Sequence, residues 1–269
     1  MKIKHILFFI WLSAFTFVFA QVPIRVTSWN LCNFGKSKSD SEIVFIANTI
    51  KNTDILAIQE VSDNYYGAQA VAKLADELNR TGSKWAYILS NPTHGKGSER
   101  YAYLWKPSIV KLKGKAWLEK SLDNQIDREP FMARFELKSG KTVLLSTIHA
   151  VPKAKEPWKE CKYLYKLNDC YKVDNLLIMG DFNLSERNDA FYKLKQSNIW
   201  PALINFKTSI KMEMREGEKF ANEYDNIFID RTEIKLLNAG RIDFTLPFIS
   251  LKEARKISDH VPVYAEIRL

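Results

Sequence analysis

A glycine, a carboxylate and a carboxamide end one apolar run of this sequence. Residues 176–183 read Leu-Leu-Ile-Met-Gly-Asp-Phe-Asn, which indicates a buried strand that delivers Asp181 and Asn183 to its carboxyl end. In an extended chain these two side chains point to the same side, with Phe182 turned toward the core. Oxygen ligands in this arrangement suit a hard cation or a phosphate-bound water. The alternative is a strand that simply ends in a turn, because Gly, Asp and Asn are common turn residues.

Two histidines also lie at the ends of apolar runs. His149 ends the β-rich run 141–149, and His260 follows Asp259 directly before another apolar run. A carboxylate partner fixes the tautomer of an imidazole and raises its basicity. Histidines beside carboxylates therefore indicate proton transfer, whereas a hydrogen-bonded core histidine is the alternative for each taken alone.

Further acidic and amide side chains stand where apolar runs stop. Together with Asp181 and Asn183, they are Asn30, Glu60, Glu99, Asp225 and Asp259. Such oxygen donors predict a site for Mg²⁺, with Ca²⁺ and Mn²⁺ as alternatives. The sequence does not group the cysteines and histidines that a structural zinc site needs. It also contains no Walker loop, no dinucleotide-binding fingerprint and no Gly-x-Ser-x-Gly elbow.

The elements that must position these residues are many strands and a few helices. Alternation and apolar runs predict strands at 24–30, 54–58, 84–89, 101–105, 141–148, 176–181, 224–229 and 261–267, with two or three short strands between 109 and 137. Helical spacing predicts helices at 43–50, 68–78, 156–171 and 189–196, and the chain from 197 to 223 is expected to be irregular. Polar residues recur where strands end, which predicts two sheets flanked by helices with a site at one edge.

The first twenty residues have the pattern of a signal peptide. Lys2 and Lys4 precede an apolar block, and Ala20 stands at the expected cleavage point. The alternative is a membrane anchor, but the block is shorter than the roughly 20 residues of a spanning helix. We therefore expect residues 1–20 to be removed and the protein to be secreted or periplasmic, with no membrane association after cleavage. Residues 21–269 contain no linker or repeat, so they are expected to form one domain.

The charge and the cysteines give weaker information. Removing the two signal lysines from the 40 basic residues leaves 38 against 31 acidic residues, a net charge of +7, and this surplus favours polyanionic partners. Three cysteines, Cys32, Cys161 and Cys170, cannot all pair within one chain. Cys161 and Cys170 lie in one expected helix, so a bond between them requires that the helix end near Asn168.

Eight short segments carry a resemblance to a known superfamily. They are Ser28-Trp29-Asn30, Ile58-Gln59-Glu60-Val61, Ser98-Glu99-Arg100-Tyr101, Arg128-Glu129-Pro130, Ile148-His149-Ala150, Met179-Gly180-Asp181-Phe182-Asn183, Tyr224-Asp225 and Ser258-Asp259-His260-Val261-Pro262-Val263. Their order and intervals resemble the endonuclease/exonuclease/phosphatase superfamily over nearly the whole chain after residue 20. The Ser-Glu-Arg-Tyr, Arg-Glu-Pro and Tyr-Asp elements resemble the deoxyribonuclease I family within it.

The resemblance implies a four-layer α/β/β/α sandwich with two packed mixed β-sheets and metal-dependent hydrolysis of phosphodiesters. It implies catalytic roles for two pairs, Glu99 with His149 and Asp225 with His260. One imidazole would protonate the leaving oxygen while the other activates or orients the water, and we take His149 as the acid. The implied ligands of one cation are Asn30 and Glu60, whereas Asp181 and Asp259 would hold a second cation or position the water. The implied substrate-binding residues are Arg128, Asn183 and Arg100.

The sequence departs from that family at three positions. Members that grip duplex DNA carry an Arg two residues after the first-strand Asn, an Arg two residues after the second-strand Glu and a Tyr two residues before the Glu-Arg pair. Here these positions are Cys32, Ser62 and Gly97. The expected grip on duplex DNA is therefore in question, and basic residues of neighbouring loops such as Arg100 would have to replace it.

Three functions remain open on this basis. The expected one is a secreted metal-dependent endonuclease, active as a monomer, that hydrolyses DNA to 5′-phosphate ends. The alternative is a phosphodiesterase of the same fold that acts on RNA, a sphingolipid or a phosphoinositide. A non-catalytic binding protein on the same scaffold is the third, although the chain keeps both histidines and the Asp-x-Asn pair.

Overall fold

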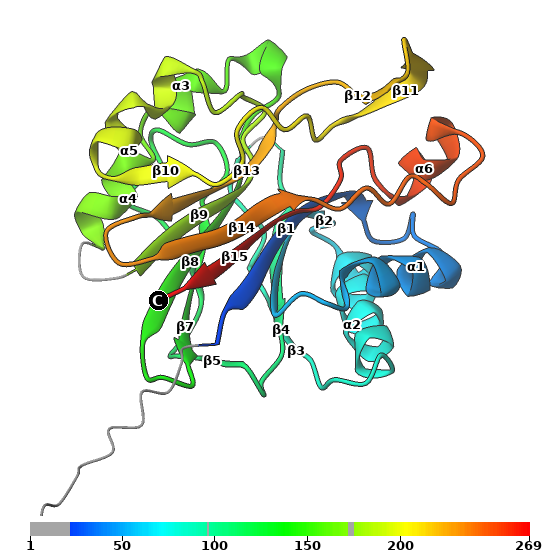
Figure 1. Cartoon of the computed structure of the whole chain (residues 1–269), viewed down its shortest axis with the longest axis horizontal. Coiled ribbons are helices and arrows are strands. Elements are labelled where there is room, and N and C mark those ends of the chain that lie inside the picture. Colours follow the sequence, from blue (N-terminus) through cyan, green and yellow to red (C-terminus); the bar gives the residue numbers. More distant parts are fainter. Residues whose placement is uncertain (1–21, 96, 172–174) are drawn as a thin grey trace, which may run out of the picture.

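Two mixed β-sheets form the centre of the molecule (Figure 1). The computed structural model describes residues 22–95, 97–171 and 175–269, so the expected signal peptide at 1–20 lies outside the described residues. Within the described part of the chain, no helix is long and apolar enough to cross a membrane.

The first sheet has six strands in the order β14-β15-β1-β2-β4-β3. Their bounds are Lys235–Arg241 for β14, Val263–Arg268 for β15, Ile24–Phe34 for β1, Ile55–Val61 for β2, Arg100–Trp105 for β4 and Ala86–Leu89 for β3. β1 and β2 are parallel, and the other neighbours are antiparallel. The sheet is therefore mixed, as expected.

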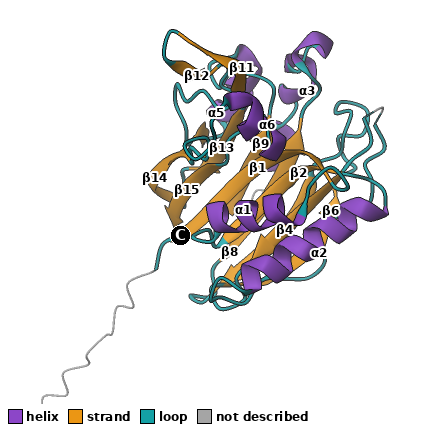
Figure 2. Cartoon of the chain, turned by 90° about the vertical axis from the view of Figure 1, so that its right-hand side faces the viewer, coloured by secondary structure: helices purple, strands orange, loops and turns teal. Residues whose placement is uncertain are grey.

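Helices cover the outer face of this sheet. They are α1 (Asp40–Ile50), α2 (Tyr65–Asn79) and α6 (Leu251–Ile257), and Figure 2 shows α1 and α2 lying across the strands. α1 begins at Asp40, three residues before the expected start at Ile43, because Ser39 and Glu42 form a capping box that satisfies backbone donors at its first turn. Its buried residues, Ile43 and Ile46 among them, belong to one apolar cluster with α2 and the sheet.

The second sheet follows the order β10-β13-β9-β8-β7-β5, and β6 pairs with β7. Their bounds are Ile199–Pro201 for β10, Asp225–Asp230 for β13, Asn175–Asp181 for β9, Thr142–His149 for β8, Phe131–Leu137 for β7, Val110–Leu112 for β5 and Trp117–Leu118 for β6. Short helices pack on its outer face, namely α3 (Trp158–Cys161), α4 (Tyr165–Cys170) and α5 (Tyr192–Gln196), through a cluster that includes Phe182 and Phe191.

A third apolar cluster lies between the two sheets. It joins Val26 and Tyr103 of the first sheet to Leu145 and Met179 of the second. Three clusters thus separate four layers, and the expected α/β/β/α sandwich is confirmed. Because burial of apolar area is the main driving force of folding, each layer is stabilised by the next.

The parallel pairs place the polar residues at one edge. β1 pairs with β2 in one sheet, and β8 pairs with β9 in the other, with His149 opposite Asp181. Gly180 allows this close pairing: its φ is +146°, and a Cβ atom there would lie 1.9 Å from the carbonyl oxygen of Ile148. Asn30 does not end β1, although the sequence predicts a strand that ends there, because the strand continues to Phe34; Asn30 is the last residue paired in regular register with β2 before a bulge, and Glu60 follows its partner Gln59. A site between the sheets therefore follows from topology.

Several local expectations need correction. The single helix expected at 156–171 is instead two short helices, α3 and α4, after a 3₁₀ turn at Lys153–Lys155. The stretch from 197 to 223 is not irregular: it contains β10 and a hairpin of β11 (Ile210–Arg215) and β12 (Glu218–Phe220). The hairpin is not predicted because its sequence is polar and rich in methionine. Its strands pair with neither large sheet.

The structure also settles the state of the cysteines and the conformation of Asn183, and only Asn183 differs from expectation. All three cysteines are free: Cys161 is buried, and Cys170 is exposed. Asn183 does not continue the extended strand beside Asp181, because β9 ends at Asp181 and the φ of Asn183 is +50°. Its backbone N–H instead donates to Asp181 Oδ1 at 2.9 Å, so the turn itself holds the carboxylate.

Candidate active site

The first histidine–carboxylate couple lies at the end of β8. His149 Nδ1 lies 2.9 Å from Glu99 Oε2, and Arg128 Nη1 donates to the same oxygen at 3.2 Å. The hydroxyl of Tyr101 accepts a hydrogen bond from the backbone N–H of His149 at 3.1 Å. These contacts fix the ring, so Nε2 is the nitrogen left for chemistry.

The second couple joins the starts of β13 and β15. His260 Nδ1 lies 2.7 Å from Asp225 Oδ2, and the Thr208 hydroxyl donates to that oxygen at 2.6 Å. Thr208 Oγ1 also accepts from the backbone N–H of Asp225 at 3.0 Å. The imidazole of His260 is therefore held by a carboxylate that is itself fixed by a buried hydroxyl.

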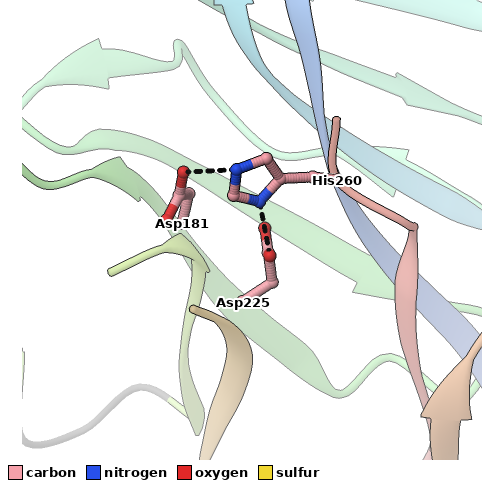
Figure 3. Close-up of side chains that lie close together, drawn as sticks. All are labelled: Asp181, Asp225 and His260. Atoms are coloured by element: carbon pink, nitrogen blue, oxygen red, sulfur yellow. Dashed lines mark hydrogen bonds and ion pairs between the residues drawn. The ribbon is translucent and has the colours of Figure 1, made fainter. Parts of the chain in front are cut away.

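Asp181 lies between the two histidines. Its Oδ2 is 3.6 Å from His149 Nε2 and 3.6 Å from His260 Nε2, and the contact with His260 is drawn in Figure 3. Asn30 Nδ2 donates to the same oxygen at 3.1 Å. The two free ring nitrogens thus converge on one point from opposite elements of the fold.

The burial of these charges shifts their pKa values. Burial alone would lower the pKa of His260, but the carboxylates of Asp225 and Asp181 raise it to about 10. Burial likewise opposes protonation of His149, and the charge and hydrogen bond of Glu99 raise its pKa above the usual value. Burial and the neighbouring Asp225 raise the pKa of Asp181, whereas the two histidines oppose that rise. Without further positive charge, the site holds its protons on the imidazoles.

The same acidic atoms suit a divalent cation. Asp181, Asp225 and His260 each offer a ligand atom, and these atoms lie within 4.8 Å of one another. Glu60 Oε1 accepts from Asn30 Nδ2 at 2.9 Å and lies 4.0 Å from His149 Nε2. Asp225 Oδ1 is buried and has no hydrogen-bond partner among the described residues. Such a set of oxygen donors with an unsatisfied buried carboxylate atom fits a hard cation.

Asp259, expected as a ligand, has other partners in the structure. Its carboxylate lies 3.3 Å from Arg255 Nη2. Burial raises the pKa of the Cys32 thiol to about 11, and the charges of Asp259 and Glu60 contribute to that rise. The carboxylates of Asp259 and Glu60 therefore both act on the Cys32 thiol. Asp259 does not belong to the group formed by Asp181, Asp225 and His260.

The expected substrate-binding residues all donate hydrogen bonds to backbone carbonyl oxygens of the protein. Arg128 donates from Nε to His149 O at 2.8 Å and from Nη2 to Ala150 O at 2.7 Å, and its side chain is 7% exposed. Asn183 Nδ2 donates to the same Ala150 oxygen at 3.0 Å. Arg100 donates to backbone carbonyl oxygens of neighbouring loops at 2.8 and 3.0 Å. All three side chains brace the loops around the site, and Arg128 also orients Glu99.

Comparison with known proteins gives the family. The sequence profile of the Endonuclease/Exonuclease/phosphatase family matches residues 27–260. The chain belongs to this family.

Similar proteins span most of the chain. It is 29% identical to deoxyribonuclease-1-like 1 of Sus scrofa over 264 residues, which cover 90% of this chain and 80% of that relative. It is 26% identical to a deoxyribonuclease of Thioalkalivibrio sp. (strain K90mix), over 91% of this chain and 71% of the relative. A family member from Bacteroides thetaiotaomicron, of solved structure, has a TM-score of 0.66 at 15% identity and covers 93% of this chain and 98% of its own. The resemblance to the deoxyribonuclease I side of the family is confirmed.

Sequence reasoning missed several residues that position this family member's site. Ser258 Oγ donates to Asn30 O at 2.5 Å and accepts from the His260 backbone N–H at 3.0 Å, and it stands within the Ser-Asp-His segment that the sequence singles out. Tyr101 likewise belongs to a matching segment. Thr208 has no such signal, because it lies in the stretch expected to be irregular and reaches Asp225 only through the tertiary fold.

Proposed function

We propose that the protein is a secreted, metal-dependent endonuclease that hydrolyses DNA phosphodiester bonds and leaves 5′-phosphate ends. The single observation that carries the proposal is the convergence of His149 Nε2 and His260 Nε2 on Asp181 Oδ2, each at 3.6 Å. Two histidines, each backed by a carboxylate, supply the acid and the base that phosphodiester hydrolysis needs. The deoxyribonuclease names of the relatives support DNA as the substrate.

The chemistry divides between the two couples. His260 Nε2 accepts a proton from the attacking water, whose oxygen forms the new bond to phosphorus. As the bond from phosphorus to the 3′ oxygen breaks, protonated His149 donates its Nε2 proton to that oxygen. The phosphate stays on the 5′ carbon. Asp225 and Glu99 keep each ring in the tautomer that this exchange requires.

Glu60 and Asp181 would hold a divalent cation, and Asp225 offers a further carboxylate in the same group as Asp181. Asn30, expected as a ligand, donates from Nδ2 to both Glu60 and Asp181 while its Oδ1 accepts from the backbone N–H of Cys32, so it would orient the two carboxylates. Mg²⁺ is the expected ion, with Ca²⁺ and Mn²⁺ as alternatives, and it would supply positive charge for the phosphate oxygens. His260 can act as a base only when the negative charges around it are offset, because the carboxylates of Asp225 and Asp181 together keep the imidazole protonated.

A plasmid assay tests this function. Purified protein is incubated with supercoiled DNA in a series of Mg²⁺, Ca²⁺ and Mn²⁺, with and without a chelator. We expect nicked circles with at least one ion and none with chelator. The product should be a substrate for DNA ligase, which requires a 5′-phosphate. Intact plasmid together with intact single-stranded DNA under every metal condition would refute the proposal.

The alternative substrate classes rest on one observation. The positions at which duplex-binding members are expected to carry cations hold Cys32 and Ser62, and in the structure Cys32 contacts acidic groups while Ser62 Oγ lies against Gly35. Neither supplies positive charge to a duplex. An assay on RNA, sphingomyelin and a phosphoinositide is the test: DNA preferred by orders of magnitude removes this alternative.

The secreted state and the monomer are parts of the same proposal. Residues 1–20 have the composition of a signal peptide, so protein exported by a host cell should begin at Gln21. N-terminal sequencing of the exported protein would check the cleavage point, and light scattering would check the monomer. An exported chain that retains residues 1–20 would contradict cleavage.

A further inference from the structure

A cleft of about 650 Å³ lies beside the active site, and the chemistry above does not use it. Its lining includes Lys153, Trp158, Arg187 and Lys207. Asn183 and Tyr224 also line it. Asn183 and Tyr224 therefore belong both to the wall of the cleft and to the surroundings of the catalytic centre.

Two contacts connect the cleft to the reacting groups. The ring of Tyr224 stacks on His260 at 6.4 Å between centroids and an angle of 28°. The backbone of Asn183 donates to Asp181, as described above. A group bound in the cleft would thus lie next to a phosphate held between His149 and His260.

Trp158 presents a free aromatic face to this cleft. It is the first residue of α3 and is 39% exposed. Its indole has no ring partner and no hydrogen bond within the residues that the structure describes. The helix beneath it is fixed, because Cys161 is buried and Glu160 accepts from two backbone N–H groups. The backbone that carries the indole is therefore fixed, and the ring keeps exposed area for a ligand.

The cations around the cleft differ in how far they are neutralised. Arg187 Nη2 lies 2.6 Å from Glu223 Oε2, and Lys207 Nζ lies 3.5 Å from Glu218 Oε2. Lys153 is exposed and makes no ion pair within the described residues. Of these three side chains, Lys153 keeps its full charge for a ligand, and it lies five residues before Trp158 in the same segment of the chain.

We infer that Trp158 and Lys153 form a subsite for the nucleotide next to the scissile bond, with the base stacked on the indole and a phosphate near the ammonium group. Aromatic stacking is tolerant of sequence because every base has a π-face. In a duplex both faces of a base are covered by its neighbours, so only an unpaired base can stack on Trp158. The preferred substrate of the site is therefore single-stranded polynucleotide, an inference that rests on the proposed nuclease function and narrows it.

Binding without turnover tests the subsite. A short fluorescent oligothymidine is titrated with the protein in chelator, beside an oligouridine and a thymidine–adenine duplex. Trp158→Ala should weaken binding of the single strand by roughly 5- to 100-fold, the effect of losing one base–aromatic stack, and leave duplex binding unchanged. Trp158→Phe keeps a ring and should restore most of the affinity, which separates stacking from a folding defect. Lys153→Ala should weaken both single strands and make binding less sensitive to salt.

Matched controls come from the same chain. Trp200 is 41% exposed but does not line the cleft, and Lys155 lies in the same 3₁₀ turn as Lys153 outside it. Trp200→Ala and Lys155→Ala should leave single-strand binding unchanged. Comparison of the oligouridine with the oligothymidine shows whether the subsite distinguishes RNA from DNA.

Kinetics provide the second readout. Trp158→Ala should raise KM for single-stranded DNA, with kcat unchanged, and leave duplex cleavage unchanged. Equal losses on single strands and duplex, or no loss at all, would overturn the subsite. A wild-type protein that cuts plasmid but is insensitive to Trp158→Ala refutes the subsite alone, whereas a protein that binds single strands through Trp158 and cuts nothing refutes the nuclease function alone.

Discussion

Asp181 and Asp225 are directly opposed residues on the antiparallel strands β9 and β13. The imidazole of His260 lies between their carboxylates, 2.7 Å from Asp225 and 3.6 Å from Asp181. Two buried carboxylates so close together repel each other, and the neighbouring Asp225 charge helps to raise the pKa of Asp181. The pair is stable only with positive charge beside it, from protonated imidazoles or from a bound cation. The register of β9 and β13 thus places two mutually repelling carboxylates at the centre of the site, where they require positive charge nearby.

Removing either of the two imidazoles that we propose as acid and base should abolish most of the turnover. We expect His149→Ala and His260→Ala each to lower kcat by at least roughly 10²-fold, the usual contribution of a general acid or base. His94→Ala is the matched control, because His94 pairs with Glu129 and belongs to neither couple. Plasmid nicking rates measure the effect. Normal turnover in both site variants would refute the mechanism.

Thr208→Val should damage the site without removing any charge. The hydroxyl of Thr208 donates to Asp225 Oδ2 and accepts from the Asp225 backbone, and both partners are buried. Valine leaves them unsatisfied, so we expect a loss of about 1–3 kcal/mol in the free energy of unfolding, together with a lower kcat. Urea denaturation and nicking rates check this.

The control is Thr27→Val. The hydroxyls of Thr27 and Thr53 are 2.7 Å apart and buried, so this variant loses a similar hydrogen bond elsewhere in the sheet. It should lose stability but keep its kcat. Equal kcat losses in the two variants would mean that the effect of Thr208 is one of general stability.

The layers and the edge that carries the site could be predicted from the sequence because they depend on local patterns. Apolar runs mark strands, and in parallel strands the residues that follow the runs meet at one edge. Glu60, His149 and Asp181 lie at or beside such ends, and Asn30 lies where the regular pairing of β1 with β2 stops. The side-chain pairing of Glu99 with His149 came from the resemblance, since 50 residues separate them and no local pattern links them.

Other features depend on tertiary contacts that no local pattern contains. Thr208 reaches Asp225 because the chain before the hairpin folds back across 17 residues. The helix expected at 156–171 is divided at residues 162–164, where the N–H groups of Tyr163 and Leu164 bond to the carbonyl oxygens of Glu160 and Cys161, three residues back, and form turns. Asn183 leaves the extended conformation, and its N–H donates to Asp181. The side chains of Asp181 and Asn183 therefore do not follow the alternation of a strand.

Glu60 should determine how much metal the enzyme requires. Its carboxylate lies beside Asn30 and 4.0 Å from His149 Nε2. Glu60→Gln keeps the shape and removes one negative charge, so a higher Mg²⁺ concentration should be needed for half-maximal activity. Isothermal titration of the metal is the direct measurement. Glu77→Gln, at the solvent-facing pair with Arg80, is the control and should leave the metal requirement unchanged.

The metal-free protein should become less stable as the pH rises from about 6.5 to about 10. The pKa of His260 is raised to about 10 in the folded state, against 6.5 for an ordinary histidine. Between these values the folded protein keeps a proton that the unfolded chain has released, so a rise in pH lowers the free energy of unfolding. Below about 6.5 both states are protonated and the stabilisation is complete.

Urea denaturation in chelator across this pH range measures that effect. His260→Gln removes the titrating group and should give a shallower decline than the wild type. The remaining slope would come from groups such as His149, whose pKa is also raised. An identical slope in the two proteins would contradict a raised pKa of His260.

Arg128→Met should show whether Arg128 binds the substrate or positions Glu99. Its nitrogens donate to Glu99 and to the carbonyl oxygens of His149 and Ala150, and removing one partner of a buried ion pair costs about 3–5 kcal/mol. If positioning dominates, the free energy of unfolding and kcat both fall while KM stays constant. Arg25→Met is the control: Arg25 pairs with Glu266 at a half-exposed site, where such a pair contributes about 1 kcal/mol or less. A selective rise in KM with normal stability would instead assign the guanidinium to the scissile phosphate, because only substrate binding would then depend on it.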